Sequence, residues 1–310
     1  MERKSGVLLH VSSLWGEYSC GSFGEEAKQF VDFLSRCGFS YWQVLPFGLV
    51  DECNSPYKSY STFGGNPYFV DLRSLYNEKL LTAEELETAR QKTPYSCEFE
   101  RLSAERVELL TKASKRVDAT LENRINDFIS ANKHLADFCK FMALKCANNN
   151  AEWTDWQEAC YSEEIEFAWR FIQYEFFTQW SEIKAYANSK GIKIIGDIPI
   201  YVSFDSSDVY FNKHLFLMDD NNRLTDVAGV PPDYFAEDGQ LWGNPLYDWS
   251  AMEKEGFSWW KDRISASLQL FDGVRIDHFR AFESFWAVPG TEKTARNGKW
   301  VKGPGMKLIN

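Results

Sequence analysis

The sequence predicts an α/β fold, and the clearest evidence lies near its start. Residues 6–10 have the pattern of a short buried strand, residues 27–37 have helical apolar spacing, and residues 41–45 have the pattern of a second strand. A strand, a helix of about twelve residues and another strand favour a right-handed parallel unit. Residues 192–202 predict a further strand, and residues 274–276 another after a helical stretch at 259–270. We therefore expect a parallel sheet with helical connections.

The composition is that of an ordinary globular protein with a surplus of aromatic residues. The 310-residue chain is 44% hydrophobic and 25% charged, and it can bury a large core as one domain or two. The 16% aromatic content fits a core or a groove that stacks on sugar rings. A net charge of −11 argues against nucleic acid or an anionic membrane as a partner. The expected ligand is neutral.

Cysteine spacing and the chain start predict a cytoplasmic protein. The seven cysteines are scattered and lack a C-x-x-C pair, which indicates neither a disulfide framework nor a metal site. We expect them to be reduced thiols. The first residues contain no apolar signal region, and no run of about 18 apolar residues follows. The sequence therefore predicts neither export nor a membrane span.

The segment after the second predicted strand, residues 54–68, is long, aromatic and rich in turn-forming residues. Such a loop suits substrate contacts, and the alternative is a rigid Ω-loop packed on its own aromatics. From about residue 80 the character becomes helical, starting with a capping box between Thr82 and Glu85. Residues 166–180 are apolar nearly all round and predict a buried helix that returns to the core.

The later part of the chain places aspartates at two predicted strand ends. The strand at 192–202 carries Asp197 toward its C-terminal end. The connection from 203 to 249 is very long, which predicts a lid or binding loop, and residues 285–289 predict one more short strand. Arg275 precedes Asp277 by two residues and so shares its side of the strand. The cation would keep Asp277 ionised, as a nucleophile requires, and the alternative is a structural ion pair.

Six segments in order resemble one family, the 4-α-glucanotransferases or amylomaltases, in the α-amylase clan of retaining (β/α)8-barrel enzymes. They are residues 5–10 (SGVLLH), 55–57 with 65–68 (SPY and GNPY), 196–201 (GDIPIY), 229–235 (GVPPDYF), 241–247 (LWGNPLY) and 273–279 (GVRIDHF). The resemblance implies a (β/α)8 TIM barrel, incomplete in this chain, with a mainly helical insertion. The expected parts are residues 1–79 as the first part of the barrel, 80–159 as the insertion, and 160–310 as its continuation with an active-site loop at 203–249.

The resemblance also implies an activity and a site. The activity is transfer of α-1,4-glucan segments between maltooligosaccharides by retaining double displacement, with no metal or organic cofactor. Asp277 matches the nucleophile and Arg275 the residue that fixes it. The matched substrate-binding positions are Ser55, Tyr57, Asp197, Tyr201, Trp242, Asn244 and His278. Among them, Asp197 and Tyr57 belong to the donor side and Trp242 to the loop over the acceptor side, while for His278 a structural role is the alternative.

The chain departs from the family pattern at its end. The family's acid/base glutamate and third catalytic aspartate lie on later barrel strands, so we expect neither in this chain, and we expect a truncated chain that is inactive alone. Glu237 and Glu283 are the candidates to replace the acid/base glutamate, but no sequence pattern places either of them opposite Asp277. The alternatives are an α-glucan hydrolase, a non-catalytic glucan-binding fragment and an inactive truncation. The long connection at 203–249 favours transfer.

Overall fold

A four-stranded parallel sheet forms the centre of the computed structural model, which describes residues 3–51 and 53–309. Its strands lie side by side in chain order: β1 (Gly6–Leu8), β2 (Tyr41–Gln43), β3 (Lys193–Ile198) and β6 (Gly273–Ile276). Parallel strands that follow one another in chain order build the wall of a (β/α)8 barrel. Within the described residues the sheet runs from β1 to β6 without closing on itself.

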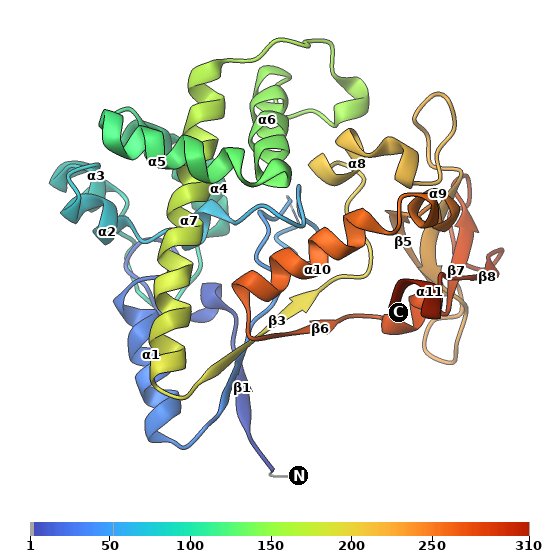
Figure 1. Ribbon diagram of the computed structural model, residues 1–310, viewed down its shortest axis with the longest axis horizontal. Helices are drawn as coiled ribbons and strands as arrows, with labels where there is room; N and C mark the ends of the chain where they lie inside the picture. Colours follow the sequence, from blue (N-terminus) through green and yellow to red (C-terminus); the bar gives the residue numbers. More distant parts are fainter. Residues whose placement is uncertain (1–2, 52, 310) are drawn as a thin grey trace.

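A helix covers each connection between these strands. α1 (Glu25–Arg36) follows β1, α7 (Glu163–Ser189) precedes β3, and α10 (Ser258–Leu270) precedes β6 (Figure 1). Gly38, just past the end of α1, has a φ of 76°, a left-handed conformation that glycine adopts readily and that commonly ends helices. The helices predicted at 27–37 and 259–270 are therefore confirmed.

The first strand differs from the prediction. We expected a buried strand at 6–10, but β1 has three residues and the side chain of Leu8 is 56% exposed. The prediction of burial was wrong because, in the described part of the chain, β1 pairs only with β2 and so lies at the edge of the sheet. The alternation of apolar residues carries no information about whether a strand is central or at an edge.

A group of helices lies between β2 and β3 in the chain. It consists of α2 (Leu72–Asn77), α3 (Ala83–Thr88), α4 (Phe99–Ser114), α5 (Ala119–Ser130) and α6 (Lys133–Ala147). The predicted capping box begins α3: the Glu85 amide donates to Thr82 Oγ1 at 3.2 Å, and the Thr82 amide donates to Glu85 Oε2 at 2.8 Å. Helices α4, α5 and α6 all pack on α7. α7 therefore joins this helical group to the central sheet.

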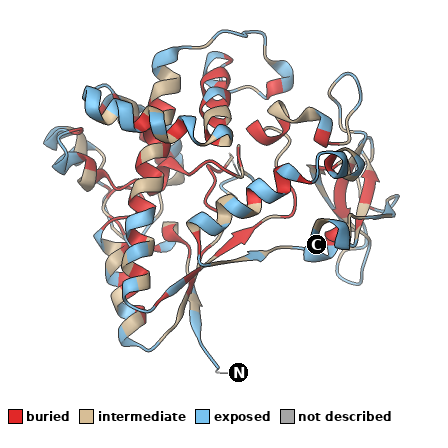
Figure 2. Cartoon of the chain, in the orientation of Figure 1, coloured by how far each residue is buried: buried red, intermediate tan, exposed pale blue. Residues whose placement is uncertain are grey.

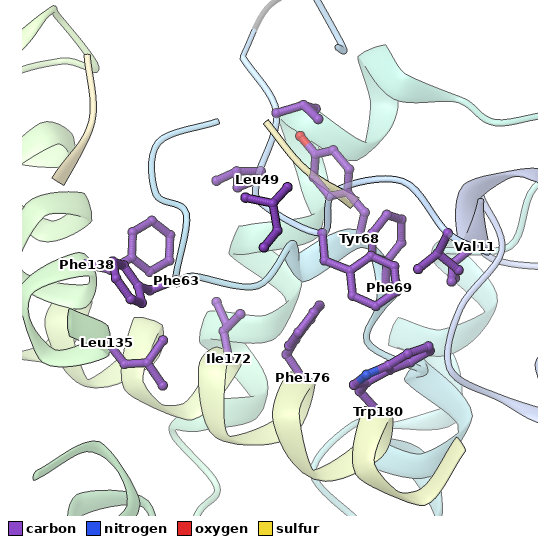
Figure 3. Packing of buried hydrophobic residues seen from close by; sticks show 14 of the residues in the cluster. Val11, Leu49, Phe63, Tyr68, Phe69, Leu135, Phe138, Ile172, Phe176 and Trp180 are labelled. Carbon is purple, nitrogen blue, oxygen red and sulfur yellow. The ribbon is translucent and has the colours of Figure 1, made fainter. Parts of the chain in front are cut away.

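The core is built on α7, the helix that the sequence predicted to be buried. Figure 3 shows Ile172, Phe176 and Trp180 projecting from α7 toward Tyr68 and Phe69 of the loop after β2. The side chains of Phe176 and Trp180 are almost fully removed from solvent, which stabilises the fold by about 2–3 kcal/mol per side chain. The Trp180 indole also donates to the Leu270 carbonyl at 2.9 Å, so α7 is fixed to the end of α10.

The connection from 203 to 249 is not an irregular loop. It contains α8 (Ser207–Phe211), β4 (Asp226–Val230), β5 (Gln240–Pro245) and the start of α9 (Trp249–Lys254). β4 and β5 join β7 (Ser284–Pro289) and β8 (Lys299–Lys302) in an antiparallel sheet of order β5-β4-β7-β8. The prediction missed β5 because Gly243 and Pro245 are turn formers, and a strand that contains them is recognisable only from its partner. β7 confirms the strand predicted at 285–289.

Burial follows this architecture. Buried residues concentrate on β3, on α7 and on the inner side of the loops, whereas the outer helices and β6 expose more of their residues (Figure 2). The remaining short elements are η1 (Val11–Ser13), η2 (Pro67–Phe69), η3 (Trp153–Asp155), η4 (Lys213–Leu215), η5 (Phe279–Phe282) and α11 (Met306–Ile309). All seven cysteines are free, as expected. In residues 3–51 and 53–309 no helix has both the length and the apolar character needed to span a membrane.

Candidate functional site

The predicted residues converge at the carboxyl ends of β3 and β6. Asp197 is the last residue but one of β3, and Asp277 directly follows β6. The two strands pair in parallel with Asp197 opposite Arg275, so their polar ends meet at one edge of the sheet. The Asp277 amide donates to the Ile198 carbonyl at 2.9 Å, which extends the pairing past the end of β6. The main chain of both strand ends is therefore fixed where the functional side chains begin.

Arg275 connects the two aspartates. Its Nη1 donates to both Asp197 oxygens, Oδ1 at 2.9 Å and Oδ2 at 2.8 Å, and its Nη2 donates to Asp277 Oδ1. Burial works against the charge of the guanidinium, but the Asp197 and Asp277 carboxylates outweigh it and raise the pKa of Arg275. Hydrogen bonds between charged groups are shorter and stronger than neutral ones. The arrangement holds the Asp277 carboxylate in one orientation beside a permanent cation.

Asp197 is the buried member of this group. Its side chain is fully buried, and its Oδ2 also accepts a hydrogen bond from the Tyr57 hydroxyl at 2.8 Å. Burial, together with the hydrogen bond to Asp197, raises the pKa of Tyr57 to about 12. Tyr57 therefore stays a protonated donor at any ordinary pH. The loop after β2 is thus tied to the ends of β3 and β6 through one carboxylate.

An aromatic wall lies beside Asp277. The Trp242 ring is 4.6 Å from the His278 ring and 6.3 Å from the Tyr201 ring, measured between centroids. His278 has a φ of 48°, and its Nε2 is 3.5 Å from Asp277 Oδ2. Tyr201 is buried, which raises the pKa of its hydroxyl. β5 brings Trp242 to this wall.

These side chains line one open cavity of about 480 Å³. The predicted residues that line it are Ser55, Tyr57, Tyr201, Trp242, Asn244, Asp277 and His278. Asp197 lines an adjoining cavity that shares Tyr57 and Tyr201 with the first, and Arg275 is hydrogen-bonded to both carboxylates. The structure therefore brings all nine predicted residues together, although they come from four separate parts of the chain.

The side chains of two predicted residues form hydrogen bonds with the protein backbone. Asn244 Nδ2 donates to the Val202 carbonyl at 2.9 Å, and Ser55 Oγ accepts from the Tyr57 amide at 3.4 Å. Both contacts stabilise the backbone beside a proposed sugar-contacting aromatic residue. The side chains of Asn244 and Ser55 thus shape the cavity as well as line it.

The sequence prediction missed part of the lining and one contact. Lys58, Gln240 and Leu241 also line the cavity, and the matched segments 55–57 and 241–247 were the available signal. The bond between Arg275 and Asp197 was missed as well. It depends on the register of two strands that lie about 80 residues apart, and residue spacing within one strand does not reveal it.

The two substitute acids do not reach this cavity. Glu237 is an exposed residue that pairs with Arg296 at 2.9 Å, and Glu283 accepts a hydrogen bond from Ser284. Among the described residues that line the cavity, Asp277 is the only carboxylate. No group of three or more His, Cys, Asp or Glu side chains suited to a metal ion is found in the described part of the chain. The cavity therefore presents one oriented carboxylate within an aromatic enclosure.

Known proteins resemble this chain over almost its whole length. A sequence model of the 4-alpha-glucanotransferase family matches residues 9–310. A 4-alpha-glucanotransferase from Clostridium butyricum is 46% identical over 322 aligned residues, which cover 97% of this chain and 65% of that protein. Another, from Aquifex aeolicus, is 42% identical, and the match covers 99% of this chain and 65% of that protein. The chain thus spans just under two thirds of the length of these curated relatives.

Solved structures give the same result for the fold. An amylomaltase from Streptococcus agalactiae in complex with acarbose superimposes with a TM-score of 0.95 at 36% identity, covering 99% of this chain and 66% of that one. An amylomaltase from Corynebacterium glutamicum has a TM-score of 0.79 at 17% identity, covering 99% of this chain and 45% of that one, and shows a shared fold. The predicted (β/α)8 fold class is confirmed by these matches, and β1, β2, β3 and β6 form part of its wall.

Proposed function

The chain belongs to the 4-alpha-glucanotransferase family, and on that premise we propose that it carries the nucleophile side of a retaining glucanotransferase site. Asp277 attacks the anomeric carbon of an α-1,4-glucan donor, the bond to the leaving chain breaks as the acid/base carboxyl gives its proton to the leaving oxygen, and a covalent glycosyl-enzyme forms. A hydroxyl of an acceptor glucan then attacks the same carbon and releases Asp277. The acid/base carboxylate takes up the proton of the acceptor hydroxyl in this second step. Two inversions leave the new linkage in the α configuration.

The bridge from Arg275 to both aspartates is the observation that carries this proposal. A carboxylate nucleophile must be ionised and must hold one orientation as the sugar approaches. Arg275 supplies the positive charge, and the buried carboxylate of Asp197 holds Arg275 in place. A plain structural ion pair would not require the carboxylate to line an open cavity, as the partly exposed Asp277 does.

The aromatic side chains supply the sugar platform in this proposal. Tyr57, Tyr201 and Trp242 present flat, partly apolar surfaces on which sugar rings stack. When these rings and an acceptor glucan exclude water, the glycosyl group passes to the acceptor. Because the Streptococcus agalactiae amylomaltase was solved in complex with acarbose, this compound is a suitable probe of glucan binding by this protein.

The proposal assigns the acid/base glutamate and the third carboxylate to groups outside residues 3–51 and 53–309. Asp277 is the only carboxylate among the described residues that line the cavity, and a retaining site needs a second one about 5–5.5 Å from the nucleophile. We further propose the division into residues 1–79, 80–159 and 160–310, a cytoplasmic location, and α-1,4-glucans and maltooligosaccharides as the partners.

Incubation of the full-length protein with maltotriose tests the function. We expect glucose together with oligosaccharides longer than maltotriose, and we expect Asp277→Asn to abolish both. Asp220→Asn, an exposed aspartate on the turn before β4, is the matched control and should retain full activity. Products no longer than maltose would identify a hydrolase. Acarbose binding without any turnover by the full-length protein would identify a non-catalytic glucan-binding protein, and neither binding nor turnover would refute the proposal.

A further inference from the structure

We propose that Asp208 is a positioning residue for the donor side of the site: its buried carboxylate holds the loop that carries Tyr57. The role in catalysis rests on the proposed function, whereas the role in holding the loop does not. Asp208 lies in α8 and is not among the residues that line the cavity with Asp277. It acts on the substrate only through another segment.

The contact between Asp208 and the loop is direct. Its Oδ2 accepts from the Thr62 amide at 2.8 Å and its Oδ1 accepts from Thr62 Oγ1 at 3.3 Å, so both oxygens of the carboxylate bind one residue. Asp208 itself is only 3% exposed. Thr62 lies five residues after Tyr57, whose hydroxyl donates to Asp197 in the site.

Two more contacts join the same segments. The Ser59 amide donates to Ser203 Oγ at 3.1 Å, and the Ser207 amide donates to the Tyr60 carbonyl at 2.9 Å. The backbone from 59 to 62 is therefore attached to residues 203–208 at three successive points. Asp208 provides the only charged one of these three, and hydrogen bonds to a charged group are the stronger ones.

The cations near Asp208 have other partners. Arg263 of α10 donates to the Pro199 and Ile200 carbonyls and to the Tyr247 hydroxyl, and His134 of α6 lies within hydrogen-bonding distance of Asp262, 3.0 Å away. Burial raises the pKa of Asp208 to about 6, while Thr62, Arg263 and His134 lower it in part.

Two further cations on the elements packed against α8 also have partners of their own. Lys145 of α6 donates to Asp205 at 2.5 Å, and Lys213 of η4 lies over the Trp153 ring at 4.6 Å. The Asp208 charge is therefore held chiefly by its bonds to Thr62. A buried carboxylate with a neutral partner is costly to ionise, and α8 has five residues, too few for a helix dipole to offset that cost.

The protonation state of the Asp208 carboxyl determines how firmly the loop from 57 to 62 is held. While Asp208 stays buried, the hydrogen bonds from Thr62 lower its pKa, so these bonds are stronger to the ionised carboxylate and weaken as the carboxyl is protonated below about pH 6. The loop from 57 to 62 should therefore loosen as pH falls through about 6. Asp208→Asn keeps one acceptor for the Thr62 amide but has no charge, so its loop should be loose at every pH.

Amide hydrogen exchange of the full-length protein between pH 5 and pH 8, corrected for intrinsic exchange, tests the contact without any substrate. In the wild type we expect protection of a peptide that spans 57–63 to rise by roughly threefold to tenfold as pH rises through 6. In Asp208→Asn the protection should be low and independent of pH. Asp220→Asn should behave as the wild type.

Kinetics test the positioning role. In Asp208→Asn at pH 7.5 we expect the donor KM to rise roughly threefold to tenfold, with kcat changed less than twofold, because the loop binds the donor and Asp277 is untouched. Wild-type KM should approach the variant's value below pH 6. Thr62→Val removes the hydrogen bond from the Thr62 hydroxyl to Asp208 and keeps the one from the amide. On a logarithmic scale we expect it to raise KM about half as much as Asp208→Asn does. It also serves as the test variant if Asp208→Asn does not fold.

The possible outcomes separate the two proposals. Full transferase activity with a loop that is equally protected in all variants at every pH would overturn the positioning role. Protection lost evenly along the whole chain, with a lower apparent kcat and an unchanged KM, would also overturn it, since that is the result of a general loss of stability. Loop protection that follows Asp208 in a protein without transferase activity would refute the proposed function and leave the contact established.

Discussion

The Arg275 guanidinium donates two hydrogen bonds from one nitrogen to the Asp197 carboxylate, at 2.9 and 2.8 Å. Asp197 is buried and cannot move with the solvent-exposed loops, so it provides a rigid support. The second nitrogen of the guanidinium then holds Asp277. The orientation of the proposed nucleophile therefore depends on a strand that does not carry it.

Replacing Arg275 by lysine should break the connection between Asp197 and Asp277. A lysine ammonium cannot contact both carboxylates in the fixed geometry of a guanidinium. For Arg275→Lys in the full-length protein we expect kcat to fall by about a hundredfold or more, which is about 2.7 kcal/mol of transition-state stabilisation. Steady-state kinetics with maltotriose checks this. The melting temperature should change little because the Arg275 side chain is half exposed, and a large drop in it would contradict a role confined to the site.

Replacing Tyr57 by phenylalanine should weaken the donor side. Tyr57→Phe removes the hydrogen bond to Asp197 Oδ2 and keeps the ring that lines the cavity. We expect kcat/KM to fall about fivefold, corresponding to a hydrogen bond worth about 1 kcal/mol. The wild-type pH profile should show no step from Tyr57 below pH 10, because the raised pKa of about 12 keeps the hydroxyl protonated. A basic limb that disappears in the variant would contradict this assignment.

Shortening Trp180 should destabilise the whole fold. The side chain is buried against Phe23, Phe47 and Phe271, and its indole donates to Leu270. We expect Trp180→Ala to lower the free energy of unfolding by about 3–5 kcal/mol, as measured by urea denaturation. Tyr95→Ala, at a side chain that is 85% exposed, is the control and should change it by less than about 0.5 kcal/mol. Equal effects of the two variants would contradict the packing described here.

Glu175 should make stability depend on pH. Burial raises the pKa of this α7 carboxyl to about 7, and the nearby Glu78 adds to the shift. Because the folded pKa lies above the unfolded value, ionisation of Glu175 opposes folding above pH 7, and the penalty disappears as pH falls toward 4.5.

Glu175→Gln tests that sign. We expect the variant to be more stable than the wild type by about 1–3 kcal/mol at pH 8 and of similar stability at pH 5, by urea denaturation at both pH values. Glu158→Gln, at an exposed position, should follow the wild type at both. A variant that is less stable at pH 8 would show that the carboxylate is favourably paired when ionised.

The sequence predicted best where one segment determines its own structure. The apolar residues of 166–180 leave no polar face, so they predict the buried α7 directly. Thr82 and Glu85 form their capping box within four residues. The site residues could be predicted as one group because the short segments that match the family include the carboxyl ends of β3 and β6, which the fold brings side by side.

Features that depend on distant partners could not be predicted in this way. The exposure of Leu8 depends on which strands pair with β1. β5 depends on its pairing with β4, which in turn pairs with β7 on its other side. The bond from Arg275 to Asp197 and the bond from Thr62 to Asp208 each join residues that are far apart in the chain. Such contacts follow from register and packing, which residue patterns do not specify.

The antiparallel sheet links two separate parts of the cavity lining. β5 carries Trp242 and is hydrogen-bonded to β4, β4 to β7, and β7 is joined to Asp277 through η5. The backbone at Trp242 is thus connected to the backbone at Asp277 through paired strands, and neighbouring strands of a pleated sheet keep a spacing of about 4.8 Å. A displacement of the β5 backbone relative to Asp277 therefore requires either a break in the β4 and β5 pairing or a movement of the whole sheet as one piece.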